Sequence, residues 1–432
     1  MDKFVVQGGA TLAGKLHISG SKNTALPLMA AALLAPGVST LGKIPNLRDV
    51  RTFQRVLEYS GATVVHNPDT AQITIDGSTL SRAESPYELV KRMRASFYML
   101  GALLGRFGEA RVSLPGGCAW GPRPVGLHLD GLQALGATIE LDAGYVVAKA
   151  PPGGLPGGRF KMTPSSVGAT INIALAAACA RGSSVIENAA MEPDVVVFCE
   201  ALQAMGVPME GVGTATLTIE GGASLRPIQF DNCPDRIELG TFMIAAALAG
   251  SHDEPLVITG GRTDHLGEAF LEAFAKSGAR VTEADGQLIV HPPTQIHPVS
   301  VETGIYPGFP TDLQAQWSVY MTQATGNAAI RDRIYTDRFK HIPELKRMGV
   351  EAIVVQDQVV IEGGHRLQGA QVMSTDLRAS VSLVLAGLVA SGETHVLRVY
   401  HLDRGYEDLE HKLAAVGAQI ERVSYDEWAD PE

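Results

Sequence analysis

The sequence predicts an α/β protein of two halves, each built from three repeats, with apolar helices buried inside and sheets outside. Three observations lead to this fold class. A helix-ending glycine recurs six times at intervals of about 70 residues. Each interval also holds a second helix that is apolar nearly all round, as buried helices are. The chain of 432 residues is long enough for two halves with full cores.

The first repeated element is an amphipathic helix that ends at a glycine and is followed by a strand. A typical example is Leu132-Gln-Ala-Leu-Gly-Ala137. Glycine adopts the left-handed conformation that stops a helix at low cost. The six glycines are Gly61, Gly136, Gly206, Gly278, Gly349 and Gly417. One such pattern is common in proteins, but six at near-constant spacing predict a repeat.

The second element is a helix with a polar start and an Ala/Leu/Met-rich body. Its six openings are at residues 21–24, 93–96, 166–170, 235–238, 311–314 and 375–378. If these helices run parallel, their N-termini share one face of each half and favour anions there. Four cations stand at the openings: Lys22, Arg94, Arg236 and Arg378. We therefore expect a positively charged cleft between the halves; the alternative is that these cations are solvated residues near helix caps.

Composition narrows the class of protein. The net charge is −11, which disfavours nucleic acid and anionic membranes as partners. The four cysteines show no CxxC spacing, so we expect neither a metal site nor a disulfide framework. No signal-like segment precedes the first strand, and the apolar runs are too short to span a bilayer. These features predict a cytoplasmic protein without membrane insertion.

One loop, Ser113-Leu-Pro-Gly-Gly-Cys-Ala-Trp-Gly-Pro-Arg-Pro124, places a cysteine near an arginine. Its glycines and prolines exclude a helix or a central strand. The charge of Arg123 would lower the pKa of the Cys118 thiol and make it available for proton transfer or nucleophilic attack. On these residues alone, a chance surface cysteine is an equal alternative.

End to end, the chain resembles the bacterial UDP-N-acetylglucosamine enolpyruvyl transferases. The resemblance rests on seven motifs: residues 19–27 (SGSKNTALP), 93–96 (MRAS), 114–123, 166–170 (SVGAT), 234–238 (PDRIE), 309–316 (FPTDLQAQ) and 375–380 (TDLRAS). It implies two inside-out α/β domains of three repeats each. The expected domains are residues 22–230, which carry the Cys118 loop, and residues 1–21 plus 231–432, which carry Asp312.

The resemblance also implies the activity. Members of this family move the enolpyruvyl group of phosphoenolpyruvate onto the 3′-hydroxyl of UDP-N-acetylglucosamine and release phosphate, the first committed step of peptidoglycan synthesis. The reaction passes through a tetrahedral intermediate and uses no cofactor. The expected partners are these two small molecules, with no obligate protein partner.

The motifs also imply roles for individual residues. Cys118 is the expected proton donor, which can form a thioether adduct, and Asp312 is the expected general base. Asp312 could instead cap its helix, or do both. Lys22, Arg123 and Arg404 are the cations expected nearest phosphoenolpyruvate, with Lys22 and Arg404 counted as catalytic. Further substrate contacts are expected from Asn23, Arg94, Arg338 and Arg378, and Asp376 is expected to orient Arg378 or to assist elimination.

The uridine diphosphate is expected to bind two runs. These are Arg123-Pro124-Val125-Gly126-Leu127, and Pro164 with Ser166-Val167-Gly168. Ile334 is a further expected substrate contact. Gly126 replaces the family's usual Asp, and Pro164 replaces its usual Lys. Each change should weaken nucleotide binding by about 1–3 kcal/mol unless Lys161 or another group compensates. Trp120 and Asp337 also depart from the usual pattern.

Two other functions remain to be separated from this one. The shikimate-pathway enolpyruvyl transferase shares the fold and mechanism but lacks the Pro-Gly-Gly-Cys loop. A non-catalytic paralogue that senses nucleotide-sugar would suit the changes at Gly126 and Pro164, whereas the retained Lys22, Cys118 and Asp312 favour an enzyme.

The thiol assignment predicts the response to fosfomycin, an epoxide that alkylates this cysteine in the family. We expect the drug to inactivate the wild type, while Cys118→Asp keeps a proton donor, turns over and resists. Residual activity after incubation with the drug measures the difference. Equal sensitivity of the two proteins would refute the role of Cys118.

Overall fold

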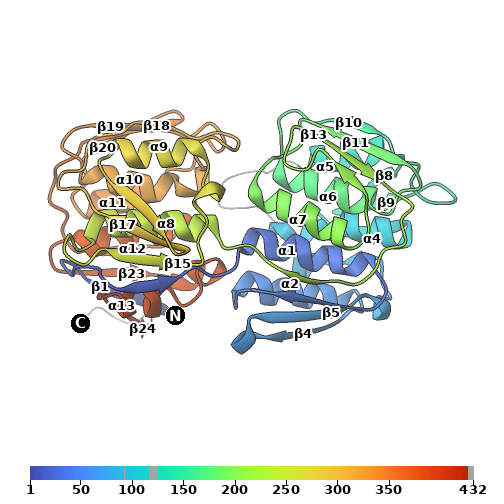
Figure 1. The fold of residues 1–432 in the computed structure, drawn as a ribbon, viewed down its shortest axis with the longest axis horizontal. Coiled ribbons are helices and arrows are strands. Elements are labelled where there is room, and N and C mark those ends of the chain that lie inside the picture. The colour runs from blue at the N-terminus through green and yellow to red at the C-terminus, as the bar shows by residue number, and fades with distance from the viewer. Residues whose placement is uncertain (92, 116–124, 427–432) are drawn as a thin grey trace. The chain divides into compact units, whose positions relative to one another are not determined.

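The computed structural model describes residues 1–91, 93–115 and 125–426, and it divides the chain into two compact units (Figure 1). Unit 1 comprises Met1–Ser19 and Pro234–Glu432, and unit 2 comprises Gly20–Cys233. The N-terminal segment thus belongs to the same unit as the second half of the chain.

Each unit contains three four-stranded sheets. In unit 2 the strand orders are β14 (Gln229–Asp231), β3 (Val38–Gly42), β5 (Gln72–Asp76), β4 (Thr63–Asn67); β6 (Glu84–Ser85), β7 (Glu109–Ser113), β9 (Tyr145–Lys149), β8 (Thr138–Asp142); and β10 (Arg159–Lys161), β11 (Ser183–Glu187), β13 (Thr216–Glu220), β12 (Met209–Glu210). In unit 1 they are β22 (Gln371–Met373), β23 (Glu393–Leu397), β1 (Asp2–Gln7), β24 (Gln419–Ser424); β2 (Lys15–His17), β15 (Leu256–Thr259), β17 (Gln287–His291), β16 (Arg280–Ala284); and β18 (Val301–Glu302), β19 (Ala328–Arg331), β21 (Gln358–Ile361), β20 (Ala352–Val355).

All of these sheets share one topology. In each sheet the short first strand pairs parallel to the second, and the other two pairings are antiparallel, as in β6–β7, β7–β9 and β8–β9. The strands that complete a sheet can come from far along the chain. Strand β1 pairs with both β23 and β24, and β2 pairs with β15.

Two sets of helices accompany the sheets. The buried set comprises α1 (Lys22–Ala31), α4 (Met99–Phe107), α6 (Val167–Ala177), α8 (Arg236–Ala249), α10 (Gln314–Thr322) and α12 (Leu377–Val389). The second set, nearer the surface, comprises α2 (Arg48–Tyr59), α5 (Gly126–Ala134), α7 (Pro193–Ala204), α9 (Glu268–Lys276), α11 (His341–Arg347) and α13 (Leu409–Ala415). A short helix, α3 (Tyr87–Val90), precedes η4 (Arg94–Tyr98). The remaining 3₁₀ turns are η1 (Ala32–Leu34), η2 (Pro68–Thr70), η3 (Gly77–Thr79), η5 (Thr263–His265), η6 (Thr311–Leu313) and η7 (Val399–Arg404).

The helix-ending glycines behave as the repeat predicts. The backbone φ angle is +98° at Gly61, +101° at Gly136 and +91° at Gly349, and the other three glycines are also left-handed. Each follows a helix of the second set, and a strand comes next. The predicted fold class, two α/β halves of three repeats with the apolar helices inside, is confirmed.

Inside unit 2, Asn172 ties three helical segments together. Its side chain is fully buried; Nδ2 donates to the Phe97 carbonyl at 3.1 Å and to His128 Nδ1 at 2.9 Å, while Oδ1 accepts from the Gly101 amide at 2.6 Å. Helix α4 approaches α6 so closely that a Cβ at Gly101 would lie 2.0 Å from the Asn172 carbonyl oxygen. The absence of a side chain at Gly101 therefore permits this packing.

No helix among the described residues is long and apolar enough to cross a bilayer. Nor do they contain a group of three or more His, Cys, Asp or Glu side chains placed to hold a metal ion.

The close approach at Gly101 predicts the effect of one methyl group. Gly101→Ala should lower the free energy of unfolding by about 2–4 kcal/mol, because α4 must move away from α6 and the amide bond to Asn172 is lost. Urea unfolding at 25 °C measures the change. The matched control is Gly126→Ala, where the new Cβ meets nothing within 4 Å. Equal unfolding midpoints for the two variants would contradict the argument.

Candidate functional site

The described site residues fall into two groups, one in each unit. Unit 1 holds Asp312, Ile334, Arg338, Arg378 and Arg404. Unit 2 holds Lys22, Asn23, Arg94, Val125–Leu127, Pro164 and Ser166–Gly168. Cys118, Arg123 and Pro124 lie outside the described residues, so their predicted roles stay predictions.

In unit 1, the carboxylate of Asp312 is shared by two arginines. Arg338 Nη1 donates to Oδ1 at 2.7 Å. Arg378 donates to Oδ2 through Nη2 at 3.0 Å and through Nε at 3.2 Å. Asp312 lies on η6, Arg338 just before α11, and Arg378 in the first turn of α12. Three segments of unit 1 therefore meet at one carboxylate.

The alternative assignment of Asp312 as a helix cap is wrong. Helix α10 begins at Gln314, and no side chain caps its N-terminus. The Asp312 oxygens are instead taken up by the arginines, whose charge makes stronger hydrogen bonds than a backbone amide does. The capping residue of this group is Asp376, which accepts from the backbone amides of Arg378 and Ala379 at the start of α12.

Burial makes the two arginines depend on this carboxylate. The side chains of Arg338 and Arg378 are 7% and 3% exposed, whereas that of Asp312 is 29% exposed. Burial alone would lower the pKa of Arg338, but the charge and hydrogen bonds of Asp312 outweigh it and the net pKa is raised. Burial would likewise lower the pKa of Arg378, but the hydrogen-bonding and acidic groups around it, Asp312 among them, raise the net pKa. Both guanidinium groups are therefore charged, and the Asp312 side chain remains partly exposed.

Tyr406 forms the wall behind Arg378. The guanidinium carbon of Arg378 lies 5.4 Å from the centre of the Tyr406 ring, and the ring hydroxyl is 2.9 Å from Thr241 Oγ1 on α8. Burial raises the pKa of Tyr406, so its hydroxyl stays neutral. Arg404 ends η7, two residues earlier, and between them Gly405 packs so closely on Leu377 that a Cβ there would lie 2.6 Å from Leu377 Cδ2. The start of α12 thus positions the segment that carries Arg404.

In unit 2, the N-terminus of α1 is held by two buried carboxylates. Asp49, at the start of α2, forms an ion pair with Lys22 at 3.3 Å. Asp194, at the start of α7, accepts from the hydroxyls of Ser21 and Thr24, both at 2.7 Å. Ser21 in turn caps the helix. Lys22 and Asn23 are therefore presented from a fixed helix end.

The two expected nucleotide-binding runs of unit 2 adjoin each other. Gly126 and Leu127 open α5, while Ser166 caps α6 and Gly168 lies in its first turn. They meet at His128, because a Cβ at Gly168 would lie 3.3 Å from His128 Cε1. Burial, and then the charge of Arg94, lowers the pKa of His128 to about 3, so this imidazole is neutral. The Thr163–Pro164 peptide bond before α6 is cis.

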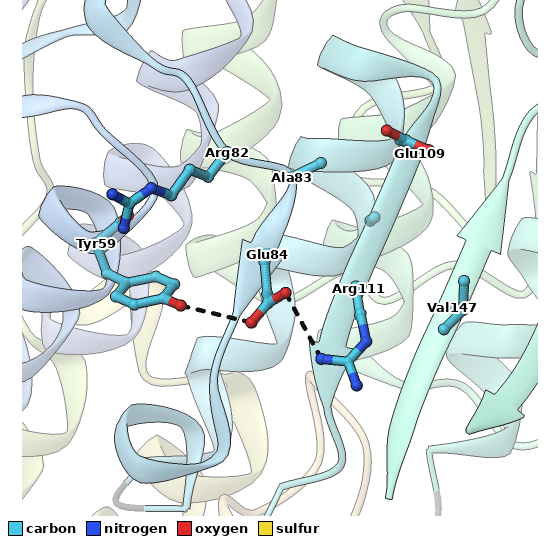
Figure 2. Close-up of a pocket in the computed structure, with 8 residues that line it drawn as sticks. Tyr59, Arg82, Ala83, Glu84, Glu109, Arg111 and Val147 are labelled. Atoms are coloured by element: carbon cyan, nitrogen blue, oxygen red, sulfur yellow. Dashed lines mark hydrogen bonds and ion pairs between the residues drawn. The ribbon is translucent and has the colours of Figure 1, made fainter. Parts of the chain in front are cut away.

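Figure 2 shows a pocket of about 460 Å³ on unit 2 that none of the predicted site residues lines. Glu84 lies at its centre, where it accepts from the Tyr59 hydroxyl at 3.4 Å and pairs with Arg111 at 3.6 Å. Arg111 also lies 3.6 Å from the centre of the Tyr145 ring. The central charges of this pocket are thus engaged with one another, and it does not contribute to the candidate site.

Several contributing residues were not anticipated from the sequence: Asp49, Asp194, Thr311, Asp332 and Tyr406. For Asp49 and Asp194 a signal existed, since each is an acidic residue in the first turn of a second-set helix. A comparison of these equivalent positions in two repeats would have indicated both carboxylates. Thr311 lies in the predicted helix opening 311–314, but its contacts, like those of Asp332 and Tyr406, were not indicated by any pattern.

A family model for EPSP synthase (3-phosphoshikimate 1-carboxyvinyltransferase) matches residues 6–413. The chain belongs to the EPSP synthase family. Among solved structures, this family member is similar to the enolpyruvyl transferase NikO from Streptomyces tendae, with a TM-score of 0.87, 27% identity, and 98% of this chain and 99% of that chain covered. It shares the fold of EPSP synthase from Acinetobacter baumannii, with a TM-score of 0.75, 18% identity, and 98% and 100% of the two chains covered.

Some curated relatives share a higher sequence identity with this chain than these solved structures do. A UDP-N-acetylglucosamine 1-carboxyvinyltransferase of Chlorobium phaeovibrioides is 51% identical, covering 99% of this chain and all of that protein. Another, from Chloroherpeton thalassium, is 50% identical over the full length of both chains. The resemblance stated from the motifs is confirmed, and the chain is an enzyme of the carboxyvinyltransferase class.

The buried histidine beside Arg338 predicts a pH dependence of stability. Burial, and then the charge of Arg338, lowers the pKa of His341 to about 3, whereas the pKa of a histidine in an unfolded chain is about 6.5. Between these values unfolding takes up about one proton, so stability rises with pH by about 1.4 kcal/mol per unit from this group.

His341→Gln should therefore reduce the pH slope of the unfolding free energy near pH 5 by about that amount. Urea unfolding at pH 4.5, 5.0 and 5.5 measures the slope. The matched control is His411→Gln on the exposed side of α13. A slope unchanged by His341→Gln, or changed equally by both substitutions, would contradict the assignment.

Proposed function

We propose that this chain transfers the enolpyruvyl group of phosphoenolpyruvate to the 3′-hydroxyl of UDP-N-acetylglucosamine with release of phosphate. The observation that carries the proposal is the Asp312 carboxylate, held by two buried arginines in a chain about 50% identical, over its full length, to proteins named for this reaction. We further propose that the reaction serves peptidoglycan synthesis in the cytoplasm.

The chemistry requires a base for the sugar hydroxyl. A carboxylate offers about four lone-pair positions, and the side chain of Asp312 is 29% exposed. A sugar hydroxyl that donates a hydrogen bond to Asp312 would lose its proton to this carboxylate as the hydroxyl oxygen attacks C2 of phosphoenolpyruvate. The guanidinium groups restrict the carboxylate to one orientation, which favours in-line approach of the hydroxyl.

The addition also requires a proton at C3 of phosphoenolpyruvate, and we assign this donor to Cys118. A C–O bond forms at C2, a proton is added at C3, and a tetrahedral phospholactoyl adduct results. Loss of a proton from C3 then expels phosphate and restores the double bond. Cations suit the two anionic groups of phosphoenolpyruvate, and we assign Lys22, Arg123 and Arg404 to them.

The nucleotide is assigned to the α5–α6 side of unit 2. Helix α6 has eleven residues, and its N-terminus, capped by Ser166, favours the diphosphate through its free amides and dipole. Val125–Leu127 and Ile334 would contact the uridine and sugar. Gly126 and Pro164 supply no charge at this place.

Phosphate release in the presence of phosphoenolpyruvate tests the proposal. We expect release with UDP-N-acetylglucosamine and none with 3-phosphoshikimate. No release at millimolar UDP-N-acetylglucosamine, with the nucleotide-sugar still bound in calorimetry, would establish the non-catalytic paralogue instead. Release with 3-phosphoshikimate alone would establish the shikimate-pathway reaction.

Replacement of the proposed base, Asp312, should slow the reaction. Asp312→Asn should lower kcat by about 10²–10⁴-fold, because the amide cannot accept the proton of the sugar hydroxyl. Steady-state phosphate release measures kcat. The control is Asp264→Asn, which breaks an exposed ion pair with Arg262 in the same unit and should leave kcat unchanged. A kcat within threefold of wild type in Asp312→Asn would refute the base assignment.

A further inference from the structure

Asp332 is a buried carboxylate that the proposed mechanism does not use. It directly follows strand β19, and its backbone amide donates to the Asp357 carbonyl at 2.8 Å. The residue is fully buried, yet within the described chain no cation pairs with its carboxylate. An ionised group in this setting is costly unless its oxygens are fully hydrogen-bonded.

Four donors surround the carboxylate. Oδ1 accepts from the Thr303 hydroxyl at 2.8 Å and from the amides of Ile334 and Tyr335 at 2.9 and 2.8 Å. Oδ2 accepts from the Thr311 hydroxyl at 2.7 Å. Through these bonds Asp332 holds two loops at once, the one that carries Asp312 and the one that leads from Ile334 to Arg338.

Thr311 connects Asp332 to the candidate base. Its hydroxyl gives its only hydrogen to Asp332 Oδ2, so its lone pairs face the other way and accept from Arg338 Nη1 at 3.0 Å. The same Nη1 donates to Asp312 Oδ1 at 2.7 Å. The order is therefore Asp332, Thr311, Arg338, Asp312, and the carboxylate at the buried end sets the direction in which the Thr311 hydroxyl points.

We propose that Asp332 is a positioning residue, which through Thr311 fixes Arg338 against Asp312 and so holds the base in its reactive orientation. This inference rests on the proposed role of Asp312. A stabilising role alone would need only the three bonds of Oδ1, two of which form the 332–335 turn while the third ties that turn to Thr303. The bond from Thr311 is the one that reaches the site.

Asp332→Asn tests the direction of the hydrogen bonds at nearly constant shape. With Oδ1 kept, the amide nitrogen faces Thr311, whose hydroxyl must then accept from it and turn its hydrogen elsewhere. The second lone pair of Thr311 still faces Arg338 Nη1, but this bond is weakened because a carboxylate no longer polarises the hydroxyl. We expect kcat to fall by about 10–100-fold, the usual effect of a lost supporting hydrogen bond behind a reactive group, with KM for phosphoenolpyruvate unchanged within about threefold.

Thr311 supplies a second pair of variants. Thr311→Val removes the hydroxyl at constant shape and leaves the other three bonds of Asp332 intact, so it should reproduce the loss of kcat. Thr311→Ser keeps the hydroxyl and should restore kcat to within about threefold of wild type. The double variant Asp332→Asn/Thr311→Val should be no worse than the poorer single variant, because both act through one path.

The matched control is Asp357→Asn, which weakens ion pairs to Arg331 and Arg333 at the same end of the sheet and should leave kcat unchanged. The proposal is overturned if Thr311→Val keeps kcat within twofold of wild type, or if the two losses multiply in the double variant. A fall in Tm with unchanged kcat also overturns it. If Asp332→Asn does not fold, the Thr311 variants decide. Wild-type enzyme that releases no phosphate would instead refute the proposed function, and this inference with it.

Discussion

The arrangement of unit 1 depends on one shared carboxylate between two buried guanidinium groups. Arg338 and Arg378 have almost no access to water, and a buried cation without a partner destabilises a fold by several kcal/mol, about 3–5 in measured cases. Their requirement for Asp312 brings together the turn before α10, the segment before α11 and the first turn of α12. The buried charges of Arg338 and Arg378 thus fix the position of the Asp312 carboxylate, which itself remains partly exposed to solvent.

In unit 2 the relative burial of the charged partners is the reverse of that in unit 1. At α1 the carboxylates are buried and the cation is the more exposed partner, since the side chains of Asp49 and Lys22 are 5% and 13% exposed. In unit 1 the cations are buried and the carboxylate is partly exposed. The repeats thus bury carboxylates around the start of α1 and guanidinium groups around Asp312.

The parts of the structure that were predictable are those that recur. Gly61 and its five equivalents stop helices through local backbone geometry, so their spacing revealed six repeats and hence the layers. The contacts of Asp312 were not predictable, because Arg378 lies 66 residues away and only the folded register brings them together. Asp312 looks like a helix cap in the sequence since Thr-Asp commonly begins a helix. Asp332 sits in Arg331-Asp-Arg333, which has the composition of a solvated surface turn, yet the strand end buries it.

The placement of the first nineteen residues has a consequence for synthesis. Strands β1 and β2 complete sheets whose other members lie between residues 256 and 424, and the Met1 amino group donates to the Tyr425 carbonyl. Unit 2, in contrast, is continuous from Gly20 to Cys233. A ribosome therefore releases every strand of unit 2 while most of unit 1 is still unmade. Strand β2 can pair only after β15 has been made, and β1 stays without its partners β23 and β24 until the last repeat has been synthesised.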